Sequence, residues 1–364
     1  MDAPAGTTLG DVTLDELRLA ARNHALPLEA LRYPVTPVGL HYLLIHYDIP
    51  AVDPETWRLE IGGSVARPLS LSLDDIRSRE AVTMPVTLEC AGNGRARLEP
   101  RPLSQPWLTE AVGTAEWTGT PLAPLLAEAG LGDDAVEVLF TGHDRGIEGG
   151  IEQSYERSLP RAEALGPDAL LAYAVNGIPL PPQHGAPLRL VIAGWYGMAH
   201  VKWLASITAL SEWFDGYQNK VGYRIYETED DEGVPVTRIR PRSLTVPPGI
   251  PDFMTRTRFL DAGPCLLEGR AWSGWAPVER VEVSVDGGAS WDDATLGDQA
   301  GERAWRGWSY EWDAPAGEHE ICSRATDAAG NVQPVDPPWN LKGFANNEVE
   351  RLRVTVRDQR RGGL

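Results

Sequence analysis

Short apolar runs, separated by proline and glycine, restrict the fold of this chain more than any other feature. The 364 residues include 30 prolines and 37 glycines, spread along the whole length. Because both residues tend to end helices and strands, the chain favours many short elements and turns over long helices. Its length suits two domains better than one.

The first two thirds of the chain contain both helical and strand-like patterns. These patterns predict short helices at 14–22 and from about 73, 121 and 160, and strands at 82–89, 136–141, 171–175 and 188–193. Further on, short alternating runs end in turns such as Asp286-Gly287-Gly288, which is typical of a β-sandwich of about 100 residues.

The expected fold is therefore α+β. We predict an N-terminal arm at 1–35, a mixed α/β domain at 36–246 and an immunoglobulin-like β-sandwich at 252–358. The proline-rich run Pro247–Pro251 between the two domains is the expected linker.

The charge of the chain excludes one class of partner. With a formal net charge of −19 at pH 7, it lacks the basic surface that nucleic-acid binding needs. No run of about 18 apolar residues is present, so no membrane-spanning helix is expected. Residues 1–10 lack the basic and apolar segments of an export signal. This predicts a cytoplasmic protein, or a periplasmic one if a leader has been removed.

Cys90 is the first candidate for chemistry and follows a predicted strand in the run Leu-Glu-Cys-Ala-Gly-Asn. A thiolate is a soft ligand for a transition metal, and the small residues Ala91 and Gly92 let a bulky cofactor approach the backbone. Arg95 is close enough in sequence to lower the pKa of the thiol or to meet an anion. A lone cysteine is more often just a small buried apolar residue, so this motif is weak when taken alone.

Two loops further along the chain carry histidine and basic side chains. In Pro-Pro-Gln-His-Gly-Ala-Pro-Leu-Arg, the guanidinium of Arg189 suits a phosphate and the imidazole of His184 suits the edge of a heterocycle. In Gly-Trp-Tyr-Gly-Met-Ala-His-Val-Lys-Trp, backbone N–H groups can cradle a phosphate, with His200 and Lys202 close behind. For the first loop the alternative is a surface ion pair, and for the second loop it is an ordinary turn.

Asp144 follows the apolar run 136–141, where its carboxylate can accept hydrogen bonds from an aminopyrimidine ring. An aspartate that caps a turn is the alternative. The sequence has no HExxH zinc motif, no GxGxxG nucleotide motif and no GxSxG nucleophile motif, which leaves those classes of enzyme without support.

The order of these signals is more specific than any one of them. His46, Cys-Ala-Gly-Asn, Asp144, His-Gly-x-Pro-x-Arg, His-Val-Lys-Trp and a terminal sandwich together resemble the sulfite oxidase family of molybdopterin-dependent oxidoreductases. The resemblance covers roughly residues 40–358. It is most specific at 88–93, 180–203 and 338–343.

The resemblance implies a molybdenum–molybdopterin cofactor whose metal is ligated by Cys90. It implies that the cofactor is bound by Tyr42, His46, Cys90, Asp144, His184, Arg189, His200, Val201 and Lys202. It implies a catalytic set of Tyr223, Arg95 and Lys342, although Tyr217 competes for the tyrosine position.

The resemblance also implies an activity and its partners. The implied reaction is oxygen-atom transfer, with sulfite oxidised to sulfate and electrons passed to an external acceptor such as a cytochrome c. The sandwich is the implied dimerisation domain of a homodimer.

Two positions depart from the family pattern. Leu44 and Lys342 each stand where sulfite oxidases of the family have an arginine. Losing one cation and replacing a planar fork with a point charge weakens dianion binding, by about 1.5–3 kcal/mol for each lost contact. A sulfane, a sulfoxide or another oxyanion therefore stays an alternative substrate. A non-catalytic binding module is a further alternative, against which the intact Cys90, Arg189 and Lys202 argue.

Cys265 and Cys322 lie on predicted strands of the sandwich, with Trp272 and Trp275 among the residues between them. The spacing is similar to that of the inter-sheet disulfide of immunoglobulin domains. Without an export signal, two free thiols are the expected state.

Overall fold

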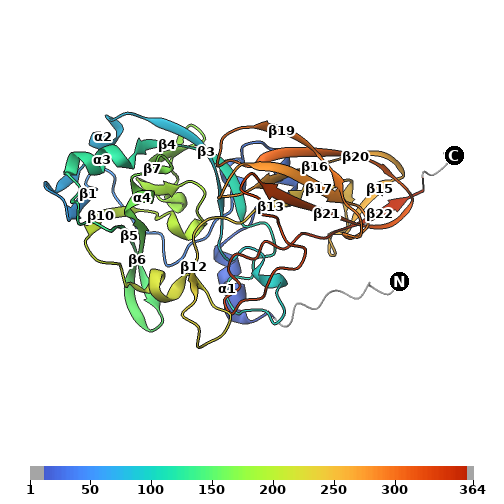
Figure 1. The fold of residues 1–364 in the computed structure, drawn as a ribbon, viewed down its shortest axis with the longest axis horizontal. Coiled ribbons are helices and arrows are strands. Elements are labelled where there is room, and N and C mark those ends of the chain that lie inside the picture. The colour runs from blue at the N-terminus through green and yellow to red at the C-terminus, as the bar shows by residue number, and fades with distance from the viewer. Residues whose placement is uncertain (1–11, 359–364) are drawn as a thin grey trace.

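The computed structural model of the chain describes residues 12–358, which form two lobes side by side (Figure 1). The prediction about an export signal, which concerns residues 1–10, lies outside the described residues. The predicted arm is described from residue 12 and contains the helix α1 (Leu14–Arg22), which begins at a Thr13 capping box. Within residues 12–358, no helix has the length and apolar character needed to cross a bilayer.

The first lobe contains two sheets. One has the strand order β2-β1-β10-β5-β6, in which only β1 and β10 run parallel. In the other, β7 pairs with β4, β8 and β9, and β3 extends the sheet beyond β4. The strands are β1 (Leu59–Gly63), β2 (Leu69–Leu71), β3 (Val82–Glu89), β4 (Val112–Pro121), β5 (Glu137–Glu148), β6 (Ile151–Pro160), β7 (Ala169–Val175), β8 (Ile178–Pro179), β9 (Arg189–Ile192) and β10 (Leu204–Leu210).

The helices of this lobe are short, as the proline and glycine content predicts. Helix α2 (Leu73–Arg77) begins at Ser72, whose side chain accepts a hydrogen bond from the backbone N–H of Asp75. Helix α3 (Leu122–Ala129) buries Leu122, Leu125, Leu126 and Ala129, which lie on one face at helical spacing. It ends at Gly130, which has the left-handed φ of 69° predicted for a glycine after a helix. The last α-helix is α4 (Arg161–Ala164).

The second lobe is the predicted β-sandwich. A four-stranded sheet with the order β13-β16-β20-β19 faces a six-stranded sheet with the order β14-β15-β22-β21-β17-β18. The strands are β13 (Arg242–Thr245), β14 (Ile250–Pro251), β15 (Arg258–Asp261), β16 (Gly263–Trp272), β17 (Val278–Ser284), β18 (Asp292–Asp293), β19 (Thr295–Gln299), β20 (Arg306–Ala314), β21 (Gly317–Asp327) and β22 (Leu352–Arg357). The small hairpin β11 (Arg224–Ile225) and β12 (Val234–Pro235) precedes them.

The α+β class and the immunoglobulin-like sandwich are confirmed, with far more strand than helix. Cys265 and Cys322 are free thiols on strands of the two facing sheets, as expected. Strand β13 lies before the predicted linker yet pairs with β16 of the sandwich. The run Pro247–Pro251 connects β13 in one sheet to β15 in the other, so its prolines mark a change of sheet rather than only a domain boundary.

A buried ion pair joins the two lobes. Arg242, at the start of β13, donates through Nη1 to Oε1 of Glu89 at the end of β3, at 2.6 Å, and both side chains are almost fully buried. Trp272 donates through Nε1 to the other oxygen of Glu89 at 2.8 Å. The residue directly before Cys90 is thereby held by two strands of the sandwich.

A second buried carboxyl lies near this junction. Glu350 accepts a hydrogen bond from the Thr109 hydroxyl at 3.0 Å through Oε1, and its Oε2 has no partner among the described residues. Burial and the nearby carboxylate of Glu110 raise the pKa of Glu350 to about 7, while Arg97 and Arg242 oppose the shift. The folded state therefore favours the protonated acid.

This raised pKa predicts a pH-dependent stability. Between the unfolded pKa of 4.5 and about 7, the folded state holds a proton on Glu350 that the unfolded chain has released. The stabilisation is therefore complete below pH 4.5 and is lost as the pH rises through 7, by roughly 3 kcal/mol in total. Between pH 5 and pH 8, the melting temperature of the Glu350→Gln variant should fall less than that of the wild type. The variant Glu318→Gln, which changes an exposed glutamate, should show the same fall as the wild type. A fall in Glu350→Gln as large as that of the wild type would show that Glu350 does not cause this pH dependence.

A candidate cofactor pocket and the hollow beside it

The loop that carries Cys90 is held by hydrogen bonds to several segments. The backbone N–H of Cys90 donates to the Ala111 carbonyl at 2.9 Å, and the Cys90 carbonyl accepts from the Asn93 N–H at 3.0 Å. The Asn93 amide group donates to Glu89 and to the Thr109 carbonyl. Ala345 donates from its backbone to the Ala91 carbonyl at 2.8 Å, so a segment near the C-terminus closes the loop.

The Cys90 thiol is free, buried and placed between two adjoining hollows. Burial raises the pKa of Cys90, while the Gly92 N–H and the charge of Arg95 oppose the shift. The pKa of the Cys90 thiol is therefore raised overall, although the charge of Arg95 acts to lower it, as the sequence predicts. A thiol in this setting becomes a thiolate when a metal cation replaces the proton.

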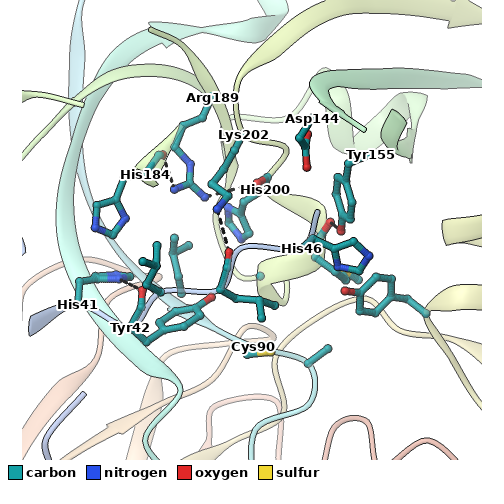
Figure 2. Close-up of a pocket in the computed structure, with 17 residues that line it drawn as sticks. His41, Tyr42, His46, Cys90, Asp144, Tyr155, His184, Arg189, His200 and Lys202 are labelled. Atoms are coloured by element: carbon teal, nitrogen blue, oxygen red, sulfur yellow. Dashed lines mark hydrogen bonds between the residues drawn. The ribbon is translucent and has the colours of Figure 1, made fainter. Parts of the chain in front are cut away.

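The first hollow, which we call the inner hollow, has a volume of about 680 Å³. Figure 2 shows Cys90 at one end and Arg189, Lys202 and His184 at the other, with Asp144 to one side. Its full lining is His41, Tyr42, Leu43, Leu44, His46, Leu88, Cys90, Ala91, Asp144, Tyr155, His184, Arg189, Gly197, Met198, His200, Lys202 and Tyr223.

The far end of the inner hollow is cationic. Arg189 donates to the His184 carbonyl at 3.0 Å and to the His200 carbonyl at 3.4 Å, and burial lowers its pKa only to about 10. Lys202 donates to the Leu44 carbonyl at 2.8 Å, and burial together with Arg189 lowers its pKa to about 7. Burial lowers the pKa of His184 and of His200 to about 3, so both imidazoles are neutral near pH 7.

Three buried polar atoms of the residues that line the inner hollow have no hydrogen-bond partner among the described residues: Nε2 of His41, Oδ1 of Asp144 and Nε of Arg189. An unpaired buried polar atom is costly, which indicates that a ligand completes the site. Burial raises the pKa of Asp144 to about 6, while Lys202 opposes the shift. A Cβ at Gly197 would lie 2.5 Å from the Tyr42 hydroxyl, so the lining leaves no room for a side chain there. A thiol at one end, an acceptor at the side and cations at the far end fit a metal-bound pterin with a phosphate.

The second hollow, which we call the outer hollow, has a volume of about 880 Å³ and shares Leu44, His46, Cys90 and Tyr223 with the inner one. Arg95 lines it and is buried, with its guanidinium carbon 4.9 Å above the Phe344 ring. The other lining residues are Leu19, Ile45, Tyr47, Gly92, Ser104, Gln105, Trp107, Ile147, Glu148 and Gly222. A small molecule in the outer hollow would reach Cys90 through a space that neither Arg189 nor Lys202 lines.

Two family models match this chain. Residues 46–218 match the oxidoreductase molybdopterin binding domain, and residues 251–357 match the Mo-co oxidoreductase dimerisation domain. The chicken sulfite oxidase is 36% identical over 87% of this chain and 72% of its own length. This chain belongs to the sulfite oxidase family. Its two matched domains are those of molybdopterin-dependent oxidoreductases.

Other members of the sulfite oxidase family extend the comparison. The mitochondrial sulfite oxidase of Mus musculus is 37% identical over 88% of this chain, which spans only 62% of that relative's length. The NADH nitrate reductase of Spinacia oleracea is 32% identical over 91% of this chain and 39% of its own length. The crystal structure of the sulfane dehydrogenase SoxCD from Paracoccus pantotrophus has the same fold, with a TM-score of 0.79. It is 24% identical, and the match covers 98% of this chain and 95% of that one.

Most of the residues predicted for the site lie together. Tyr42, His46, Cys90, Asp144, His184, Arg189, His200, Lys202 and Tyr223 line the inner hollow, and Arg95 lines the outer one. Val201 is fully buried behind the lining, where its carbonyl accepts from the Leu190 N–H. Tyr217 lines neither hollow, whereas Tyr223 lines both.

Lys342 lies just outside the outer hollow. Its ammonium donates to the carbonyls of Val221 and Gly222 and stands 4.8 Å above the Tyr226 ring. Its backbone carbonyl accepts from Nε of Arg95 at 2.8 Å. The residue thus positions the Arg95 guanidinium through its main chain, while its own charge is used elsewhere.

Among the lining residues that sequence reasoning missed are His41, Tyr155, Glu148 and Phe344. His41 directly precedes Tyr42, so the family resemblance that predicted Tyr42 could also have predicted His41. Tyr155 and Glu148 lie on β6 and β5, in a region where an alternating strand pattern gives no signal for function. Phe344 follows the Asn-Leu-Lys-Gly run, and only the fold brings that segment to Arg95.

The molybdenum cofactor of this family supplies two-electron oxygen-atom transfer when it is bound. The described residues supply the rest. Cys90 would offer the protein sulfur, Arg189 and Lys202 would offset negative charge, and Asp144 would accept hydrogen bonds from the pterin. Arg95 and Tyr223, which line the outer hollow, would bind and orient a small anion.

Proposed function

We propose that this chain oxidises sulfite to sulfate and passes the electrons to an external one-electron acceptor. Cys90 and Tyr223 lie where the two hollows meet, and Arg95 lines the outer hollow beside them; this arrangement carries the proposal. In Arg95, only Nε donates a hydrogen bond to a protein carbonyl, whereas Nη1 and Nη2 make no hydrogen bond to the described residues. A guanidinium with two free N–H edges beside the metal ligand suits an oxyanion. The sulfite oxidase relatives, at 36–37% identity, support the same choice of substrate.

Steady-state kinetics of the wild-type protein test this function. The protein is produced in a host supplied with molybdate, its molybdenum content is measured, and ferricyanide reduction is followed with sulfite as the electron donor. We expect saturable turnover and formation of one sulfate for every two ferricyanide ions reduced. Protein with a full complement of molybdenum and no turnover of sulfite would refute the proposal.

A different substrate at the same cofactor is the second candidate. Leu44 lines both hollows with an apolar side chain, and Glu148 adds a carboxylate to the outer one. Both features disfavour a dianion relative to a less charged molecule. The nitrate reductase relative and the fold shared with a sulfane dehydrogenase are compatible with another oxyanion, a sulfane or a sulfoxide.

Substitution of Leu44 by arginine should strengthen the binding of sulfite. The side chain at this position faces the shared part of the two hollows, while the backbone carbonyl that holds Lys202 is unaffected by the change. One regained charge-assisted contact of about 1.5–3 kcal/mol predicts a KM for sulfite that is about 10-fold to 100-fold lower. Leu44→Met, which keeps the size without the charge, should leave the KM close to that of the wild type. An unchanged KM in Leu44→Arg would show that sulfite does not bind beside residue 44.

The proposal includes a homodimer formed through the sandwich. Residues 251–357 match a dimerisation domain, and β14 with the turn that follows it exposes three large apolar side chains, those of Ile250, Phe253 and Met254. Burying such side chains against a second copy is favourable. A small redox protein such as a cytochrome c is the proposed electron acceptor.

A further inference from the structure

The outer hollow has a positive side and a negative side. On the positive side, Arg95 presents Nη1 and Nη2, which make no hydrogen bond within residues 12–358, while its Nε is fixed by the Lys342 carbonyl at 2.8 Å. The Phe344 ring lies 4.9 Å from the guanidinium carbon and limits its movement. This arginine is therefore rigid and ready to bind one anionic group.

Glu148 forms the negative side. Its Oε2 accepts three hydrogen bonds: from Nε2 of His46 at 2.9 Å, from the Tyr47 hydroxyl at 3.1 Å and from Nε2 of Gln218 at 2.7 Å. Its Oε1 accepts none from the part of the chain that the structure describes, and the side chain is 33% exposed. Burial acts to raise the pKa of Glu148, but these hydrogen bonds hold the pKa below its usual value. One oxygen of an ionised, immobilised carboxylate is thus available to a ligand.

The rest of the outer hollow is largely apolar. Leu19 of α1, Leu44, Ile147, Trp107 and Phe344 contribute to its lining. Lys342 is not among the lining residues, and its ammonium donates to the carbonyls of Val221 and Gly222. A small dianion such as sulfite leaves this apolar surface uncovered and meets a carboxylate as well as an arginine. A longer molecule with one anionic end, an apolar middle and a cationic end would match all three parts.

We propose that the outer hollow binds an aminoalkyl sulfinate, with its sulfinate on Arg95 and its ammonium on Glu148, and that this chain oxidises it to the aminoalkyl sulfonate. The inference rests on the proposed function, because a sulfinate offers the same sulfur lone pair as sulfite. In the balanced step, R–SO2⁻ and H2O give R–SO3⁻, two protons and two electrons. One S–O bond forms at the lone pair, both O–H bonds of water are broken, and the electrons reduce two equivalents of a one-electron acceptor such as ferricyanide.

Three donors distinguish this proposal from sulfite oxidation alone: sulfite, ethanesulfinate and 2-aminoethanesulfinate. We expect the loaded wild-type protein to turn over all three, with kcat/KM about 10-fold higher for the amino compound than for ethanesulfinate. Turnover of sulfite with none of either sulfinate would overturn this inference and leave the proposed function standing. Fully loaded protein that oxidises none of the three would overturn both.

The variant Glu148→Gln tests the role of the carboxylate. We expect kcat/KM to fall about 10-fold for 2-aminoethanesulfinate, because the variant no longer attracts the ammonium group. We expect kcat/KM for sulfite to rise, because the variant no longer repels the anion. A purely structural role of Glu148 would lower both values and would contradict the proposal. The control is Glu152→Gln, which removes the same charge from the exposed Glu152 on β6, outside the lining, and should preserve all three values.

Calorimetric binding of the product gives a readout that needs no turnover. We expect 2-aminoethanesulfonate to bind the wild-type protein about 10-fold more tightly than ethanesulfonate does, and Glu148→Gln to remove that difference. Equal affinities of the two sulfonates for the wild-type protein would overturn the assignment of the ammonium to Glu148.

Discussion

Replacement of Arg242 by methionine is expected to lower the free energy of unfolding by about 3–5 kcal/mol. The substitution removes the ion pair with Glu89 and leaves a carboxylate whose side chain is only 2% exposed. The hydrogen bonds that Trp272 and Asn93 donate to this carboxylate remain, but neither carries a compensating charge. Urea and thermal unfolding, followed by tryptophan fluorescence, measure the effect.

Two controls separate a lost charge from a lost side chain. The double variant Glu89→Gln with Arg242→Met removes both charges and should recover much of the stability, since no unpaired charge stays buried. Arg280→Met removes an exposed pair with Asp293 and a second pair with Glu282, which keeps its pair with Arg324, and should change the free energy of unfolding by less than about 1 kcal/mol. An Arg242→Met variant with the small effect of Arg280→Met would show that the two lobes do not depend on this pair.

Cys90→Ser is expected to abolish sulfite turnover and to reduce the molybdenum content of the purified protein. Serine has nearly the same shape, but its hydroxyl is a poor soft ligand and stays protonated, so the metal loses its protein sulfur. Metal analysis and the ferricyanide assay measure the two effects separately. Cys265→Ser, which changes a half-buried thiol in the sandwich, should leave both quantities unchanged. Turnover and molybdenum content at wild-type levels in Cys90→Ser would show that Cys90 is not the metal ligand.

Much of the fold was predictable because its signals are local. Ser72 begins α2 through its own side chain, and Gly130 ends α3 through its φ, so neither position depends on distant parts of the chain. Strand β13 was not predictable in the same way. Arg242 looks like a surface residue in the sequence, and its burial depends on Glu89, which is far away along the chain.

The same distinction applies to the candidate site. Cys90, His184 and Arg189 lie in loops with unusual composition, so the sequence marks them before their neighbours are known. Glu148 lies at the end of a long strand beside two glycines, where a carboxylate commonly points into solvent. Glu148 is held in place for a ligand by three hydrogen bonds, which residues of other segments donate to its carboxylate. The charge balance of the substrate hollow is therefore a property of the tertiary structure.

The contact between Ala345 and the Cys90 loop has a consequence for the order of events during biosynthesis. The Ala345 N–H binds the Ala91 carbonyl, Asn346 donates to the Gly94 carbonyl at 2.8 Å, and Phe344 lies beside Arg95. Asn346 follows Gly94 by 252 residues, so the cysteine loop can close only after this later segment has been synthesised and has folded against it. A nascent chain that stops before residue 344 lacks these contacts, which leaves the loop open on that side. Closure of the loop around a pterin would therefore follow the synthesis of β21.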